Sequence, residues 1–221
     1  MALKKSIIQM FKEKGYCIFD NFVNLSDIKK LQNVYQKVID TIYKNSSTLL
    51  YSKCPSLLWI KNPENVIGND ITLNKIIKRS KLFSAELFDV PAVNIQTYLR
   101  FFHKPVGSIE TPWHQDKAYL KNNSKERINI WIPLDNTEKQ NGCLNFIPYS
   151  HKQKLYPHEL DKRNLKNTTL YIKNINDKNI VTISLLIGQA SAHHWLTIHS
   201  ANSNISQNDR RSLVIICEKL S

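Results

Sequence analysis

The chain has 221 residues, of which 42% are hydrophobic, and this suits one globular domain with a sizeable buried core. It contains no run of about 18 apolar residues and no sustained apolar segment near its N-terminus, so we expect neither a transmembrane helix nor a signal peptide. The net charge is +13, but the lysines are spread along the chain without a run of five. The charge alone therefore does not predict a nucleic-acid or membrane partner, although an anionic small substrate stays open.

The four cysteines are scattered and form no Cys-x-x-Cys pair, so the sequence indicates neither a zinc knuckle nor a disulfide framework. This usage is typical of a reducing compartment, and we expect a cytoplasmic protein. The cysteines are Cys17, Cys54, Cys143 and Cys217.

The first 90 residues are predicted to be mostly helical, because apolar side chains recur there at helical spacing. Gly15 ends the first helix and a short strand is expected directly after it. Ser26 is the expected N-cap of the second helix. Residues 45–70 contain Ser, Pro and Gly and are expected to form a loop. The predicted helices are residues 6–14, 26–43 and 71–88, and the short strand is residues 16–19.

From residue 92 onward the sequence predicts strands separated by turn signals. Residues 148–180 form a long polar insertion, and a loop of that length in a compact domain is often a lid or a binding loop. Helices first and strands afterwards favour an antiparallel sandwich or barrel with helices packed outside. We therefore expect a single domain over residues 1–221, with a helical flank (1–90) and a mainly β core (91–221). The expected strands are residues 93–103, 114–120, 127–134, 143–147, 181–187, 190–199 and 210–217.

The stretch Trp113-His114-Gln115-Asp116 carries two side chains that are common metal ligands. Because side chains alternate along an extended segment, His114 and Asp116 share one face. An imidazole and a carboxylate on one face can fill two adjacent positions on a metal ion. A third ligand must come from elsewhere in the chain.

A candidate for the third ligand is His199, at the end of the segment 190–199, which contains three histidines. If this segment is one straight strand, His193 and His199 share a face that is polar and aromatic, as expected for a strand that lines a cavity. A lone histidine is more often structural than a ligand. The earlier His-x-Asp pair favours the ligand interpretation for His199.

Arg210 follows on the next expected strand, and its fork of donors suits a carboxylate. Ser212 shares its face, whereas Arg211 points to the other side, unless a bulge at the start of the strand exchanges the two arginines. Two histidines and one carboxylate form the facial triad of non-haem Fe(II) oxygenases, which leaves three metal positions open. A keto acid can occupy two of these positions and dioxygen the third, and Arg210 can hold the far carboxylate of the keto acid.

Several motifs in order resemble the phytanoyl-CoA dioxygenase family of Fe(II)/2-oxoglutarate-dependent oxygenases. The resemblance covers about residues 10–218, including the opening Lys14-Gly15-Tyr16-Cys17-Ile18, which is followed by a helix. The matching stretches are Lys104-Pro105-Val106-Gly107-Ser108, Thr111-Pro112-Trp113-His114-Gln115-Asp116, Asn129-Ile130-Trp131-Ile132-Pro133-Leu134-Asp135, Asn141-Gly142-Cys143-Leu144-Asn145-Phe146-Ile147-Pro148-Tyr149-Ser150-His151, and His199 through Asn204 and Ser206 to Arg210.

The resemblance implies a mainly β fold, a double-stranded β-helix (jelly-roll, cupin-like) core with flanking helices. It implies that His114, Asp116 and His199 bind Fe(II) and also form the catalytic centre. Arg210 would anchor the cosubstrate 2-oxoglutarate. Trp131 matches a family tryptophan near this cosubstrate, although the strand pattern alone is equally consistent with a core position.

The implied reaction is hydroxylation of an unactivated C–H bond of a small molecule of the amino-acid, acyl or natural-product type. Dioxygen and 2-oxoglutarate are consumed, and succinate and CO2 are formed. Related halogenases leave the carboxylate position empty for chloride, so Asp116 favours hydroxylation over halogenation. Desaturation and ring chemistry stay open.

The sequence departs from the family pattern at two places. Tyr149 stands where the family usually has Gly, and Ala201 stands where some members carry a serine, with Ser200 one place earlier. His151 is expected to be structural. His103 and His158 are expected at the surface, away from the proposed ligands.

Three other functions compete with the dioxygenase. They are a cupin-like metal-binding protein without 2-oxoglutarate oxygenase activity, a binding protein with a degenerate site, and a nucleic-acid oxygenase or binder, which only the net charge suggests. We expect a monomer or weak homodimer that acts on a small molecule, with no nucleic-acid partner.

Overall fold

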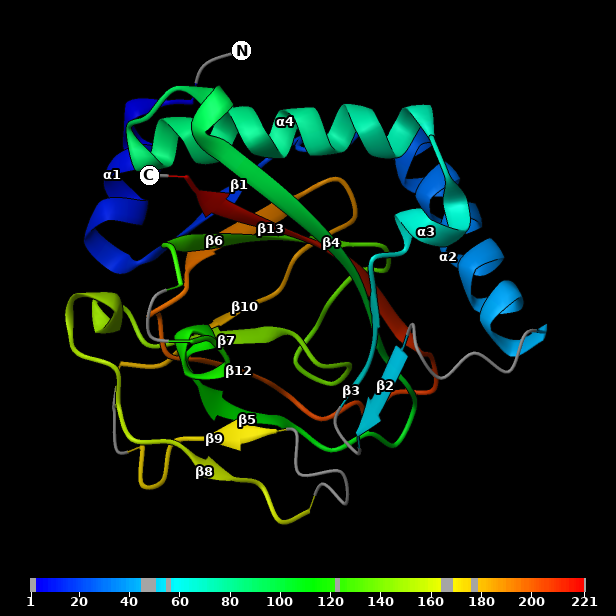
Figure 1. The fold of residues 1–221 in the computed structure, drawn as a ribbon. Helices are drawn as coiled ribbons and strands as arrows, with labels where there is room; N and C mark the ends of the chain where they lie inside the picture. Colours follow the sequence, from blue (N-terminus) through cyan, green and yellow to red (C-terminus); the bar gives the residue numbers. More distant parts are fainter. Residues whose placement is uncertain are drawn as a thin grey trace.

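The computed structural model describes residues 3–44, 51–54, 57–121, 124–163, 169–175 and 179–220. Two antiparallel sheets face each other (Figure 1). The seven-stranded sheet has the order β1 (Tyr16–Phe19), β11 (Ala190–His194), β6 (Arg127–Pro133), β13 (Arg210–Lys219), β4 (Ile95–Lys104), β3 (Leu57–Lys61) and β2 (Tyr51–Cys54). The four-stranded sheet has the order β10 (Val181–Ile183), β7 (Leu144–Phe146), β12 (His199–Ala201) and β5 (Thr111–His114).

The helices cover the outer face of the seven-stranded sheet, and Figure 1 shows α4 lying across it on the side away from β5 and β12. Leu213, Ile215 and Phe101 project from the sheet into this helix-side core, where each is fully buried. The alternation of strand side chains explains why these positions are apolar. The helices are α1 (Lys5–Lys14), α2 (Leu25–Lys44), α3 (Glu64–Ile67) and α4 (Ile71–Phe88), with short 3-10 turns η1 (Ala92–Asn94), η2 (Asp116–Tyr119) and η3 (Ser150–Lys152).

A second core lies between the two sheets. Trp131, Val214 and Ile216 reach it from the seven-stranded sheet, and Leu144 and Phe146 reach it from the four-stranded sheet. Antiparallel strands with two packed sheets and outer helices are the double-stranded β-helix that the sequence predicted. None of the helices in the described ranges is long and apolar enough to cross a membrane.

Part of the 148–180 insertion lies along β5 of the four-stranded sheet. Its two-stranded ribbon, β8 (Glu159–Leu160) and β9 (Leu170–Tyr171), is tied to β5, since the Ile172 amide donates to the Trp113 carbonyl at 2.8 Å. Ile147, Ile172 and Ile198 form a third apolar cluster there. A lid role for this insertion stays a prediction, and residues 164–168 and 176–178 lie outside the described residues.

Two expectations for the N-terminal half need correction. The second helix begins at Leu25, and Asn24 rather than Ser26 caps it, because the Asn24 Oδ1 accepts from the Asp27 amide at 2.7 Å. The expected loop 45–70 contains β2, β3 and α3 in its described part. β3 is a strand because it pairs with β4, and a pairing partner distant in sequence is invisible to a local pattern.

The expected strand 190–199 is in fact two strands in different sheets. β11 ends at His194, and a tight turn, closed by the Thr197 amide bonding to the His194 carbonyl at 2.8 Å, carries the chain to β12. The expected strand 114–120 is wrong, because the strand here, β5, ends at His114 and the chain then forms the 3-10 turn η2. Both corrections concern a point where a strand ends and the chain turns, after β11 and after β5.

Candidate active site

Three side chains that could hold a metal ion converge between the two sheets. His114 ends β5 and His199 begins β12, and these residues are direct cross-strand partners with ring centroids 4.2 Å apart. Asp116 follows at the start of η2. One ligand atom from each of His114, Asp116 and His199 lies within 4.8 Å of the other two. The structure therefore brings together all three residues that the sequence singled out as metal ligands.

Hydrogen bonds to backbone carbonyls orient both imidazoles. The Nδ1 of His114 lies 2.8 Å from the Pro112 carbonyl oxygen, and the Nδ1 of His199 lies 2.9 Å from the Thr197 carbonyl oxygen. A carbonyl only accepts, so each Nδ1 carries the proton and each Nε2 keeps a lone pair. These Nε2 atoms lie 3.7 and 3.8 Å from the carboxylate oxygens of Asp116.

The electrostatics keep the group in the form that binds a cation. Burial lowers the pKa of His199 to about 3, with the nearby His114 adding to the effect, so the imidazole is neutral at pH 7. Burial raises the pKa of the Asp116 carboxyl, but its interactions with His199, His114 and His193 outweigh that effect, and the pKa ends well below its usual range. A neutral imidazole beside an ionised carboxylate is the state in which both can be ligands.

Two residues of the seven-stranded sheet contact the carboxylate of Asp116. Asn129 on β6 donates from its Nδ2 to Asp116 Oδ2, and His193 on β11 places its Nε2 3.3 Å from the same oxygen. Asn129 and His193 are cross-strand partners, so they reach Asp116 side by side. The sequence pattern placed His193 beside His199, but it could not show that the two approach from opposite sheets.

A buried cation also faces the space between the two sheets. Arg210, at the start of β13, is 2% exposed, and its guanidinium lies 5.3 Å from the centre of the Trp131 ring. Its Nη1 donates to Ser212 Oγ at 3.1 Å and its Nη2 donates to the Gly142 carbonyl at 3.2 Å. Burial lowers its pKa to about 10, with the charges of Asp135 and Cys143 opposing that effect. Ser212 and Trp131 thus both contact Arg210.

Arg210 lacks a carboxylate partner among the described residues, and its Nε has no hydrogen-bond partner there. A buried guanidinium is costly unless an anion compensates it. Lys104 is fully buried directly across from Arg210 on β4, and its Nζ donates to the Ile109 carbonyl at 2.7 Å. This end of the space between the sheets is therefore suited to an anionic ligand.

Two further residues are placed differently from expectation. His158 is not a remote surface residue, because its Nε2 accepts from the backbone amide of Gln115, between the two candidate ligands, at 3.0 Å. Gln115 is fully buried and ties the loop down by donating to the Leu196 carbonyl at 2.8 Å. Ser200 faces away from the site and accepts from Asn145, whereas Ala201 packs inside, so Ser200 cannot replace the serine that some family members carry.

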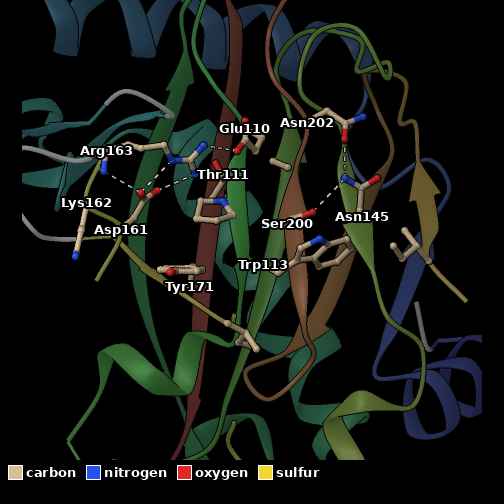
Figure 2. Close-up of a pocket in the computed structure, with 14 residues that line it drawn as sticks. Glu110, Thr111, Trp113, Asn145, Asp161, Lys162, Arg163, Tyr171, Ser200 and Asn202 are labelled. Atoms are coloured by element: carbon tan, nitrogen blue, oxygen red, sulfur yellow. Dashed lines mark hydrogen bonds and ion pairs between the residues drawn. The ribbon is translucent and has the colours of Figure 1, made fainter. Parts of the chain in front are cut away.

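A pocket of about 750 Å³ has none of the three candidate ligands in its lining, and its lining residues are drawn in Figure 2. Trp113, Ser200 and Asn145 line it with side chains from the outer face of the four-stranded sheet, and Arg163 closes one side through ion pairs with Asp161 and Glu110. The candidate ligands point to the opposite, inner face. This pocket is therefore not the place where a metal and its substrate would meet.

Two facing antiparallel sheets with two histidines and one carboxylate between them define a double-stranded β-helix protein with a candidate facial-triad site. The family model described as phytanoyl-CoA dioxygenase matches residues 11–212, and the chain belongs to this family. It is an Fe(II)/2-oxoglutarate-dependent dioxygenase, as the sequence motifs predicted, and enzymes of this class use Fe(II), 2-oxoglutarate and dioxygen.

Known proteins resemble the chain over most of its length. A probable alpha-ketoglutarate-dependent hypophosphite dioxygenase of Stutzerimonas stutzeri is 25% identical and covers 93% of this chain and 75% of its own. The peroxisomal phytanoyl-CoA dioxygenase of Bos taurus is 23% identical over 93% of this chain and 65% of its own. The crystal structure of EvdO2 from Micromonospora carbonacea var. aurantiaca, complexed with 2-oxoglutarate, has the same fold, with a TM-score of 0.83, 21% identity, and coverage of 99% and 92%.

Proposed function

We propose that the chain binds Fe(II) through His114, Asp116 and His199 and hydroxylates a C–H bond of a small molecule, with succinate and CO2 as coproducts. Arg210, Ser212 and Trp131 bind the 2-oxoglutarate. One observation carries this proposal above all. A His-Asp-His group and a buried arginine without a carboxylate partner among the described side chains both face the space between the two sheets.

The donor set fits a divalent iron ion. Two neutral imidazoles and one carboxylate are the ligands that non-haem Fe(II) uses when open positions must remain for cosubstrate and dioxygen. The backbone carbonyls of Pro112 and Thr197 hold both rings with the free Nε2 toward Asp116. Such outer hydrogen bonds fix the tautomer and the orientation of a ligand histidine.

The buried cation fits the dicarboxylate cosubstrate. Arg210 is positioned to bind the far carboxylate of 2-oxoglutarate, and Ser212 is positioned to offer its hydroxyl beside it. A charge-assisted hydrogen bond of this kind contributes about 1.5–3 kcal/mol. Trp131 covers the guanidinium and keeps bulk water from it.

The bound metal and 2-oxoglutarate together supply the oxidising power for C–H cleavage, and the protein supplies position and shielding. His114 and His199 are almost fully buried, whereas a quarter of the Asp116 side chain is exposed. The substrate therefore approaches from the Asp116 side. Asn129 and His193 hold that carboxylate in place while the substrate binds beside it.

Asp116 also supports hydroxylation as the outcome, because a carboxylate in this position leaves no room for a chloride ligand. The names of the relatives do not agree on a substrate, since one is a hypophosphite dioxygenase and another a phytanoyl-CoA dioxygenase. The proposal therefore names the substrate only as a small molecule.

The test is a panel of small molecules incubated with the purified protein, Fe(II), ascorbate and 2-oxoglutarate. We expect at least one compound to increase succinate release and to gain one oxygen atom, as read by mass spectrometry. Chlorinated product in the presence of chloride would contradict hydroxylation. Metal binding without any 2-oxoglutarate binding by calorimetry would favour the cupin-like protein without oxygenase activity.

A further inference from the structure

Arg100 on β4 points into the space between the two sheets. It lies directly across from Val214 on β13, which in turn lies across from Trp131 on β6. Directly opposed residues of antiparallel strands point to the same face. Val214 and Trp131 belong to the core between the sheets, as do Tyr98 and Phe102, the neighbours of Arg100 on the same face of β4.

This arginine differs from the other two that face the inside. Arg127 forms an ion pair with Glu218 at 2.6 Å, and the buried Arg210 donates a hydrogen bond to the Gly142 carbonyl. Arg100 stays partly exposed and, among the side chains that the structure describes, none makes an ion pair or hydrogen bond with its guanidinium. Its charge is therefore available to a ligand that enters between the sheets.

Arg100 is also close to the candidate metal ligands. Burial lowers its pKa, the charge of Asp116 raises it and the charge of Arg127 lowers it, so the guanidinium lies within electrostatic range of both. Two strand spacings of about 4.8 Å and two residue rises of about 3.4 Å separate the backbone of Arg100 from that of Asn129, which contacts Asp116. A small molecule can span the distance between this guanidinium and the metal position.

We propose that Arg100 is a substrate-binding residue that takes an oxyanion group, a carboxylate or a phosphoryl group, of the primary substrate. This inference rests on the proposed function, because it assigns Arg210 to the cosubstrate and leaves Arg100 for the molecule to be oxidised. A guanidinium fork binds two oxygens of such a group at once and so fixes its orientation. Tyr98 and Phe102 flank the fork with aromatic rings that suit an apolar body attached to the anion.

The experiment uses the protein loaded anaerobically with Fe(II) and 2-oxoglutarate, so that the Arg210 site is filled. Acetate and inorganic phosphate serve as probes of the two kinds of oxyanion, and acetamide serves as the neutral counterpart of acetate. Calorimetry is run on the wild type, Arg100→Gln, Arg100→Lys and Arg79→Gln. Arg79 is a control on the outer side of the molecule, where it packs over Phe22 and Phe83.

We expect the wild type and Arg79→Gln to bind at least one anion and not acetamide, with an affinity about tenfold or more above that of Arg100→Gln. Arg100→Lys keeps the charge without the fork and lies between them. The affinity for 2-oxoglutarate is expected to stay within about twofold of the wild type in all variants.

Three results overturn the inference. They are equal anion binding by the wild type and Arg100→Gln, no binding of either anion by the wild type, and a loss of 2-oxoglutarate affinity in Arg100→Gln, which would assign Arg100 to the cosubstrate. Absence of 2-oxoglutarate binding by the wild type would already be seen before any anion is added. That result contradicts the proposed function itself, and the two failures are thereby distinguished.

Discussion

At the scale of single residues, the site is organised around Asp116. Two candidate ligand histidines face it from the four-stranded sheet, and Asn129 and His193 contact it from the seven-stranded sheet. One carboxylate thus meets side chains of both sheets. The expected consequences of single substitutions follow from these contacts.

Replacing Arg210 should weaken cosubstrate binding in particular. The buried guanidinium has only neutral partners in the described chain, so Arg210→Ala removes the charge that a carboxylate would pair with. We expect the KM for 2-oxoglutarate to rise about tenfold or more, with a smaller rise in Arg210→Lys. Steady-state succinate release against 2-oxoglutarate concentration measures this, and an unchanged KM in Arg210→Ala would remove Arg210 from the cosubstrate site.

Replacing Asn129 should weaken metal binding without removing a ligand. Asn129→Leu deletes the hydrogen bond that holds Asp116 Oδ2. Loss of such an outer partner typically costs about 10–100-fold in metal affinity. An anaerobic Fe(II) titration measures the affinity, with Asn33→Leu on the exposed face of α2 as the control. Equal affinities in the two variants would show that Asn129 does not position the carboxylate.

At the scale of elements, the turns place the site. The turn between β11 and β12 moves the chain from one sheet to the other, and this brings the tilted rings of His193 and His199 to within 4.5 Å of each other, centre to centre. The turn after β7 contains Tyr149, whose φ of +67° lies in the left-handed region. A glycine is favoured there, which explains why the family usually has one at this position.

Tyr149 therefore offers a test of backbone strain. We expect Tyr149→Gly to be more stable than Tyr149→Ala by about 1 kcal/mol, because both lose the side chain but only alanine retains a Cβ at positive φ. Chemical denaturation of the two variants measures the difference in the free energy of unfolding. A glycine variant no more stable than the alanine variant would mean that the turn relaxes without cost.

At the scale of the whole molecule, the candidate site contains side chains from both sheets. The candidate ligands come from β5, η2 and β12, and the residues of the other sheet that contact Asp116 come from β6 and β11. An ion bound between them stabilises the folded state but not the unfolded chain. The metal should therefore couple to the global stability of the protein.

Metal removal should lower the melting temperature. At an Fe(II) concentration about 100 times Kd, binding stabilises by about 2.7 kcal/mol, which corresponds to roughly 5–11 °C for a chain of this size. We expect anaerobic thermal unfolding of the wild type to shift by this amount between Fe(II) and a chelator. His199→Ala should show almost no shift, and an equal shift in that variant would place the metal elsewhere.

The sequence predicted what depends on local pattern. Periodicity located α1 and α4, and the motifs around His114 and His199 located the candidate ligands. What it missed depends on pairing and on facing elements. β3 exists because β4 pairs with it, and Asn129 contacts Asp116 because two sheets face each other. A local sequence pattern predicts neither the pairing of β3 with β4 nor the contact of Asn129 with Asp116.

The central claim is that this group of residues holds iron and drives turnover of 2-oxoglutarate. The most direct measurement is succinate formation by the purified protein with Fe(II), ascorbate and 2-oxoglutarate, compared between the wild type, Asp116→Ala and Asp40→Ala, a surface carboxylate on α2. We expect slow succinate formation by the wild type and Asp40→Ala, and background levels for Asp116→Ala. Full activity in Asp116→Ala would contradict it.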